Sequence, residues 1–276
     1  MTIERKLLGT TPVSGEVLPE AVSFDGTNDY LSRSSDMTGN SNSKTFTFSA
    51  WFYLTGTGED NVYRWGNNNI DFVESGGFYK FTARFDEGPP NYDYAFLINT
   101  THELPANTWL NILISGNAAT QTFKFYVNDT AQTHTSTNPK NLAIGWTSST
   151  HNIGTPTNFK GRMSNFFLDH TYRDLSVTAN RRLFIDADGK PSDTIPSSPI
   201  LYLPMTDAAT AGSNSGTGGD FTVSGILADA ARGPNQDNCS ASTFDGSADY
   251  LTRASIGASN SKVFTVSGTI NVTGGD

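Results

Sequence analysis

The sequence predicts an all-β protein: a two-sheet antiparallel sandwich of the jelly-roll type, followed by the start of a second, similar domain. Apolar and polar residues alternate over many short segments, which is typical of strands with one face on a core. Clusters of Gly, Asn, Asp and Pro separate these segments and indicate turns. A decapeptide near the N-terminus also recurs near the C-terminus.

The recurring peptide indicates a duplicated domain. Residues 24–33 read FDGTNDYLSR and residues 244–253 read FDGSADYLTR. The similarity resumes with SNSKTF at residues 41–46 and SNSKVF at residues 259–264. Two shared blocks in the same order predict a repeat, and the second copy stops within or just after the strand-like run 263–272.

A Pro-, Ser- and Asp-rich stretch at residues 186–199 is typical of a linker. Strand-like runs follow at 200–205 and 221–227. We therefore expect an N-terminal anchoring arm (1–19), a complete jelly roll (20–187), a linker (188–198) and a partial second jelly roll (199–276).

The strands of the first domain follow from strict alternation. In residues 45–54, Phe46, Phe48 and Phe52 share one face, and Trp51 and Tyr53 share the other. Two further segments alternate in the same way: Leu110, Ile112 and Ile114 against Trp109 and Asn111, then Phe123, Phe125 and Val127 against Tyr126 and Asn128. Turns are expected at 66–69, 88–91 and 128–129, and one short helix is expected near 177–185.

Charge and composition exclude several classes of protein. The net charge of −9 and the pI near 4.8 argue against tracking nucleic-acid phosphates, which requires basic surfaces. The sequence contains no apolar stretch long enough to cross a bilayer and no secretory signal in residues 1–15. With Cys239 as the only cysteine, an intrachain disulfide is excluded. We expect synthesis in the cytoplasm and neither a nucleic-acid nor a membrane partner.

Five segments resemble the successive strands of laminin-G-like domains, which belong to the concanavalin A-like lectin and glucanase jelly rolls. They are FDGTNDYL (24–31), FTFSAWF (46–52), NTWLNILIS (107–115), FKFYVND (123–129) and NIG with FKGRMSNFFLDHTYRDLS (152–154 and 159–176). Their order matches that of the family. The resemblance implies a jelly roll over about residues 20–185.

Some relatives bind Ca²⁺ near the FDG turn with help from a later acidic pair. Asp25 and Asp29 are present in that turn, whereas the later acids are replaced by Met163, Ser164 and Asn165. Because Ca²⁺ requires six to eight oxygen ligands, we expect no cofactor, with Ca²⁺ at this turn as the alternative. Otherwise the Asp25 carboxylate caps backbone N–H groups beside Gly26.

Related glucanases carry three carboxylates on one strand, in the pattern E-[ILV]-D-x-x-E. The nearest segment is NIDFVE (69–74), in which the nucleophile position is Asn69. Regular alternation places Asp71 and Glu74 on opposite faces, so a retaining glycosidase site is not expected. No other catalytic motif occurs, and the sequence predicts a non-enzyme, with a glucanase-type hydrolase as the weakest alternative.

Binding is the positive hypothesis. The outward-facing residues Trp51, Tyr53, Trp109, Asn111, Tyr126 and Asn128 could stack a sugar ring and hydrogen-bond its hydroxyls. The alternative is that long loops cover this face and the aromatic residues form a second small core. By the same alternation, Lys80 and Arg84 also point away from the core. A second candidate is the loop 86–94, which reads DEGPPNYDY, with an ordinary solvent loop as its alternative.

The opening MTIERKLLGT, the segments ILYLPM and NSGTGGDFTVSGIL, and ARGPNQ (231–236) resemble tandem jelly-roll proteins of tailed bacteriophages. The resemblance implies a virion fibre or decoration protein that adheres to surface glycans or to neighbouring virion proteins, held by its N-terminal arm. The alternative is a purely structural subunit without glycan binding. A homo-oligomer is expected; a stable trimer would favour the structural alternative and a monomer with glycan affinity would favour the glycan-binding one.

Overall fold

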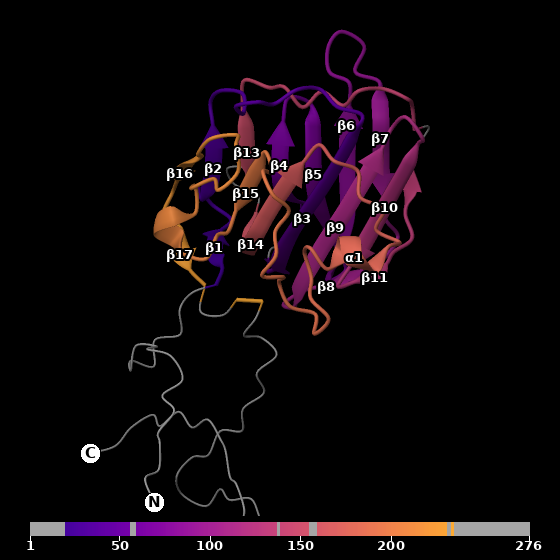
Figure 1. Ribbon diagram of the computed structural model, residues 1–276. Coiled ribbons are helices and arrows are strands. Elements are labelled where there is room, and N and C mark those ends of the chain that lie inside the picture. The colour runs from indigo at the N-terminus through magenta and orange to yellow at the C-terminus, as the bar shows by residue number, and fades with distance from the viewer. Residues whose placement is uncertain (1–19, 56–58, 137–138, 155–158, 231–232, 235–276) are drawn as a thin grey trace, which may run out of the picture. The chain divides into compact units, whose positions relative to one another are not determined.

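The computed structural model describes residues 20–55, 59–136, 139–154, 159–230 and 233–234 (Figure 1). Within these ranges the chain forms 17 strands in two sheets, with a short helix α1 (Thr178–Arg181) and a 3-10 turn η1 (Ala208–Thr210). The expected arm (1–19) and the second FDG copy (244–253) lie outside the described residues.

Sheet A has eight strands and sheet B has nine, and all their pairings are antiparallel. Sheet A runs in the order β11 (Thr130–Ala131), β10 (Thr122–Val127), β9 (Trp109–Asn117), β3 (Thr45–Leu54), β14 (Lys160–Asp169), β1 (Val22–Asp25), β17 (Ala228–Asp229), and β15 (Leu201–Leu203) also pairs with β14. Sheet B runs in the order β12 (Thr135–Ser136), β7 (Tyr94–Asn99), β6 (Phe78–Asp86), β5 (Asn68–Ser75), β4 (Glu59–Trp65), β13 (His151–Ile153), β2 (Tyr30–Arg33), β16 (Thr222–Ser224), and β8 (Leu104–Pro105) also pairs with β6. The predicted all-β sandwich is confirmed.

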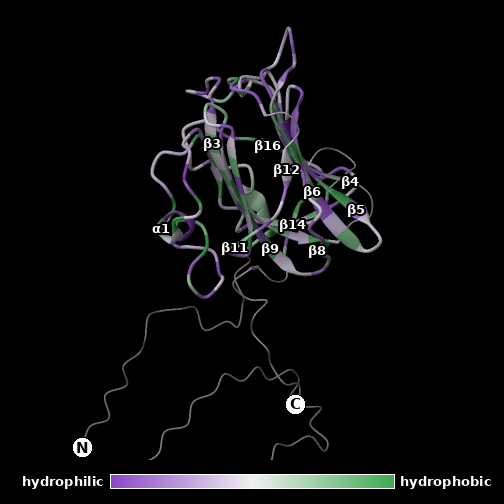
Figure 2. Cartoon of the chain, turned by 90° about the vertical axis from the view of Figure 1, so that its right-hand side faces the viewer, coloured by the Kyte–Doolittle hydropathy of each residue, from purple (hydrophilic) through white to green (hydrophobic). Residues whose placement is uncertain are grey.

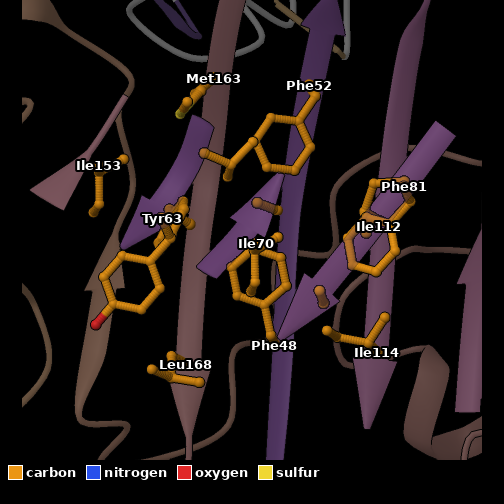
Figure 3. Packing of buried hydrophobic residues seen from close by; sticks show 14 of the residues in the cluster. Phe48, Phe52, Tyr63, Ile70, Phe81, Ile112, Ile114, Ile153, Met163 and Leu168 are labelled. Atoms are coloured by element: carbon orange, nitrogen blue, oxygen red, sulfur yellow. The ribbon is translucent and has the colours of Figure 1, made fainter. Parts of the chain in front are cut away.

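One hydrophobic core fills the space between the sheets. Figure 3 shows Phe48 of β3 beside Ile70 of sheet B, and Ile112 of β9 beside Phe81 of sheet B. Phe46, Phe48 and Ile112 are all fully buried, as the alternation predicts. Gly116 of β9 lies opposite Phe46 of β3, and a Cβ atom there would lie 2.3 Å from the Phe46 ring, so this strand glycine makes room for the aromatic side chain.

The sequence predicts a linker at residues 188–198 and a second domain from residue 199. For residues 199–230 this assignment is wrong. Strand β15 pairs with β14, β16 pairs with β2 and β17 pairs with β1, so residues 199–230 complete the first sandwich rather than begin a second one. Leu201, Leu203 and Phe221 are buried in the same core. The compact unit that includes the sandwich extends over residues 19–238.

The segment after β14 covers part of the outer face of sheet A. Figure 2 shows α1 on the side of β3 that lies away from β4, β5 and β6. Leu175 and Phe184 pack there against Leu113 of β9 and Phe167 of β14. None of the helices in the described ranges is long and apolar enough to cross a membrane.

The partly buried imidazole of His170 makes the stability of the sandwich depend on pH. Burial lowers the pKa of His170 from 6.5 to about 4, although the nearby carboxylates of Asp169 and Asp36 partly offset this effect. The folded state therefore favours neutral His170. The unfolded state takes up this proton near pH 6.5, whereas the folded state does so only near pH 4. The free energy of unfolding is therefore unaffected by His170 above pH 6.5 and decreases as the pH falls from 6.5 towards 4.

We expect the protein to lose about 2 kcal/mol of unfolding free energy between pH 7 and pH 4.5 through this one side chain. His170→Phe removes the titration and keeps a ring beside Trp146, whose centroid lies 5.2 Å from that of His170. Urea unfolding of both proteins at the two pH values should show the smaller loss in the variant. Parallel losses would place the acid sensitivity elsewhere.

Candidate functional site

Three aromatic side chains lie on the outer face of sheet A, where two adjacent strands pair. Tyr53 of β3 is opposite Trp109 of β9, and Trp51 is opposite Asn111 in the same ladder. The rings of Tyr53 and Trp109 lie 5.6 Å apart in an edge-to-face arrangement. Because Phe52 and its inward neighbours occupy the core, alternation directs these aromatic side chains to the opposite side of the sheet.

Segments from both ends of the sandwich sequence cover most of these indole rings. Ala21, Ile185 and Ala230 pack against Trp51 and Trp109, whose exposed fractions are only 2% and 6%. The structure therefore contains the second small core that the sequence left open as the alternative. Tyr53 stays half-buried at the edge of this cluster, and the guanidinium of Arg162 lies 4.4 Å from its ring centroid.

A pocket of about 450 Å³ nevertheless remains beside this cluster. We call it the aromatic pocket. It is lined by Trp51, Tyr53, Asn107, Thr108, Trp109, Asn128, Asp188, Gly189 and Pro234. Four of the six predicted sugar-binding residues thus meet at one concave site.

The indole nitrogens of the aromatic pocket are unusual. The Nε1 atoms of Trp51 and Trp109 are buried and have no hydrogen-bond partner among the described residues. A buried donor without a partner costs free energy, and most buried indole N–H groups are paired. Both residues with such a donor line the same pocket.

Amide side chains lie at the mouth of the pocket. Asn128 is exposed and adopts a left-handed backbone conformation, with φ 45°, in the turn after β10. Its Oδ1 accepts the backbone N–H of Asn111 at 2.7 Å, which fixes the side chain against β9. Asn107 and Thr108 are exposed just before β9. These groups can hydrogen-bond a polyhydroxylated ligand.

The other two predicted residues do not line the aromatic pocket. Asn111 is buried within sheet A, and its Nδ2 lies 3.4 Å from Ser49 Oγ. Tyr126 packs in the separate cluster beneath α1, where the guanidinium of Arg181 lies 5.0 Å from its ring centroid. Strand parity placed both on the outer face, but it could not reveal which segments of the chain cover them.

Sequence reasoning missed Asp188 and Gly189. It placed them at the start of the linker, whereas they border the aromatic pocket. The only local signal was the Asp-Gly pair, which is typical of a turn. The backbone N–H groups of Asp188 and Lys190 donate to Asp186 Oδ1, which shapes this turn.

The loop 86–94 lies at a rim of the sandwich, as its place between β6 and β7 requires. Glu87, Gly88, Pro89 and Tyr92 border a second pocket of about 340 Å³. The loop is closed by its own backbone, since Glu87 N–H donates to Asp93 O and Tyr92 N–H donates to Gly88 O. Ligand binding by this loop stays a prediction.

The glucanase-like segment does not assemble a carboxylate pair. Strand β5 pairs with β6 without a register shift, with Asp71 opposite Thr82 and Glu74 opposite Tyr79. The predicted placement of Asp71 and Glu74 on opposite faces is confirmed, because they are three positions apart, an odd number, along a regular strand. Glu74 Oε1 instead accepts the backbone N–H of Gly77 in the following turn.

The acidic residues of the FDG turn serve the backbone. Asp25 Oδ1 accepts the backbone N–H groups of Thr27 and Asn28 at 2.7 and 3.2 Å, and these bonds lower the pKa of Asp25. Asp29 accepts the backbone N–H groups of Asp25 and Ile226. The predicted capping role of Asp25 is confirmed. Within the described ranges, no three His, Cys, Asp or Glu residues gather as a metal site.

Comparison with known proteins agrees with this fold. A family model described as the concanavalin A-like lectin/glucanases superfamily matches residues 25–170, more than half of the chain. A candidate carbohydrate-binding protein from Bacteroides ovatus is similar in structure, with a TM-score of 0.52, 16% identity, and coverage of 78% of this chain and 61% of its own. The heptameric SAP-like pentraxin of Limulus polyphemus has a TM-score of 0.51, 11% identity, and coverage of 77% and 95%. At these identities the likeness shows the fold alone. A comparison with curated proteins finds no match.

Proposed function

We propose that this chain, which belongs to the concanavalin A-like lectin/glucanases superfamily, is a non-enzymatic carbohydrate-binding protein that holds a neutral sugar in the aromatic pocket. The observation that carries the proposal is that Trp51, Tyr53 and Trp109 line one pocket and that the indole N–H groups of the two tryptophans have no hydrogen-bond partner among the described residues. Tyr53 offers a half-buried ring, and Asn107 and Asn128 offer amides at the mouth. A sugar presents both an apolar C–H face and hydroxyl groups, so this lining matches its chemistry.

Two further facts are in keeping with binding rather than catalysis. The Bacteroides ovatus protein of similar fold is itself a candidate carbohydrate-binding protein, and this chain spans 61% of its length. Asp71 and Glu74, the nearest match to a glucanase pair, lie on opposite faces of sheet B. A double-displacement mechanism requires two carboxylates about 5–5.5 Å apart on one side of the sugar.

We propose in addition that the protein works on a phage particle, held by residues 1–19 and presenting the jelly roll to surface glycans. This setting rests on the resemblance of MTIERKLLGT and ARGPNQ to tandem phage proteins. The alternative is a structural subunit whose sandwich contacts only neighbouring virion proteins.

Tyr53→Ala should weaken sugar binding about tenfold, because it removes the half-buried ring at the mouth without opening the central core. A glycan array with the full chain first identifies a neutral ligand, and titration calorimetry then measures its affinity for each variant.

Trp109→Phe keeps an aromatic ring but deletes the indole N–H, and should weaken sugar binding severalfold in the same titration.

Tyr92→Ala is the matched control, since Tyr92 is an exposed tyrosine of the 86–94 loop. Loss of affinity in Tyr92→Ala with full affinity in Tyr53→Ala would move the site to that rim. An array without any signal from neutral host-surface glycans would leave the structural alternative as the better explanation.

A further inference from the structure

The outer face of sheet B carries a second depression, about 570 Å³ in volume, that differs in chemistry from the aromatic pocket. We call it the polar groove. Strands β4 to β7 and the β4–β5 turn form it, with Arg64, Gly66, Asn67, Asn68, Asn69, Asp71, Val73, Thr82, Ala83, Arg84, Leu97, Ile98 and Asn99 as its lining. Because the core lies between the two sheets, the polar groove and the aromatic pocket lie on opposite faces of the sandwich.

Strand register brings the polar side chains into rows. Asn69 of β5 pairs with Arg64 of β4 and with Arg84 of β6, which places an amide between two guanidinium groups. In the next row, Thr82 pairs with Asp71 and Asn99. Side chains paired across antiparallel strands lie about 4.5–5.5 Å apart at Cβ, so each row can contact one ligand at several points.

The arginines are accessible, whereas their carboxylate partners are buried. Arg64 is 47% exposed in its side chain and reaches Asp71 at 3.8 Å, and Asp71 also accepts a hydrogen bond from Asn69 Nδ2. Arg84 is 33% exposed, and its Nη2 donates to the fully buried Asp86 at 3.0 Å. A ligand that enters the groove therefore meets guanidinium N–H groups first, although the chain as a whole carries a charge of −9.

The side chain of Arg84 is also held in place by its neighbours. Its guanidinium lies 5.1 Å from the ring centroid of Tyr94. Its Nε is buried and has no hydrogen-bond partner in the described part of the chain. A guanidinium that is held in place and whose side chain is 33% exposed is suited to a carboxylate, because its planar fork matches the two carboxylate oxygens.

The lining contains no aromatic residue, in contrast to the aromatic pocket. It offers amides and a hydroxyl instead, from Asn67, Asn69, Asn99 and Thr82. Hydrogen bonding therefore dominates recognition here, and hydroxyl groups beside a carboxylate are the complementary chemistry. Only Val73, Ala83, Leu97 and Ile98 are apolar, which favours a sugar over a peptide with apolar side chains.

We propose that the polar groove is a second binding site, for a saccharide that carries a carboxylate, as a uronic acid does. Arg64 and Arg84 bind the carboxylate, and the surrounding amides bind ring hydroxyls. The site is independent of the proposed neutral-sugar function, because it shares no residue with the aromatic pocket.

The test is titration calorimetry of the full chain with tetragalacturonate, its methyl ester and hexaglutamate. We expect tetragalacturonate to bind at least about tenfold more tightly than the ester, because esterification removes the charge that the guanidinium groups recognise. Its affinity should fall as NaCl rises from 50 to 300 mM. Tighter binding of hexaglutamate would reassign the groove to acidic peptides, and equal binding of ester and acid, or no binding, would overturn the proposal.

Arg64→Gln should reduce tetragalacturonate affinity about tenfold, because it removes one of the two guanidinium groups that bind the carboxylate. Arg64 lies at the surface, so its substitution leaves the core intact. Arg84→Lys keeps the charge but loses the planar fork, and should also weaken binding. Lys124→Gln on β10 is the matched control for a lost positive charge, and Tyr53→Ala should leave this affinity unchanged. A loss in Tyr53→Ala equal to that in Arg64→Gln would contradict a separate site.

Discussion

Phe46→Ala should lower the free energy of unfolding by about 3–5 kcal/mol, close to a third of the stability of a typical domain. Phe46 is fully buried on β3, in the core between the two sheets. Its ring centroid lies 4.5–6.3 Å from those of four other buried aromatic residues, Phe85, Phe96, Phe123 and Trp146. The hydrogen-bonded ladders on both sides cannot close around the missing ring, so a cavity remains.

Urea unfolding at pH 7, followed by circular dichroism, measures this loss. Phe78→Ala is the control, because Phe78 is the same residue type at the start of β6 but is 43% exposed. We expect the control to change stability by less than about 1 kcal/mol. A loss for Phe46→Ala as small as that of the control would mean that this ring does not join the two sheets.

Much of the sandwich was predictable because the information is local. The run 45–54 coincides with β3, and the inward positions Phe46, Phe48 and Phe52 follow from alternation alone. The turn at 128–129 was predictable from Asn and Asp, and both residues have positive φ in the structure. Neither prediction required knowledge of which strand pairs with which.

The extent of the domain was not predictable in this way. Residues 186–199 have the composition of a linker, and the runs at 200–205 and 221–227 have the character of strands. Both observations hold for the sequence, yet they do not specify a partner strand. The pairings of β15 with β14 and β16 with β2 join residues far apart in the chain, and composition carries no signal of such contacts.

In the candidate site, too, the local features were predictable from the sequence and the long-range contacts were not. Parity placed Trp51, Tyr53 and Trp109 together on one outer face, and the structure brings them to one pocket. Parity could not show that residues 175–185 cover Tyr126. Similarly, Arg84 was predicted to face outward, but its row with Asn69 and Arg64 depends on the register of three strands.

A chain that stops at residue 198 should fail to fold cooperatively, in contrast to a chain that continues to residue 238. The shorter chain lacks β15, which pairs with β14, and the edge strands β16 and β17, which pair with β2 and β1. It also lacks six buried apolar residues of the central core, namely Leu201, Leu203, Met205, Ala211, Phe221 and Leu227. Burial of a large apolar side chain contributes about 1.5–3 kcal/mol, so their combined loss is comparable to the whole stability of a domain.

Thermal melting followed by circular dichroism and by tryptophan fluorescence distinguishes the two domain boundaries. If residues 199–230 belonged to a second, independent domain, the chain ending at 198 would melt cooperatively at the same temperature as the longer chain. If they complete the first sandwich, as the pairing of β15 with β14 requires, the shorter chain has no sharp transition and aggregates through the exposed edges of β1 and β2. The decisive contacts are those of Phe166 and Leu168, whose strand partners Leu203 and Leu201 lie beyond the truncation. Leu201→Ala and Leu203→Ala in the full chain should therefore each lower the unfolding free energy by about 2–5 kcal/mol, which reproduces part of the truncation without removing any backbone pairing.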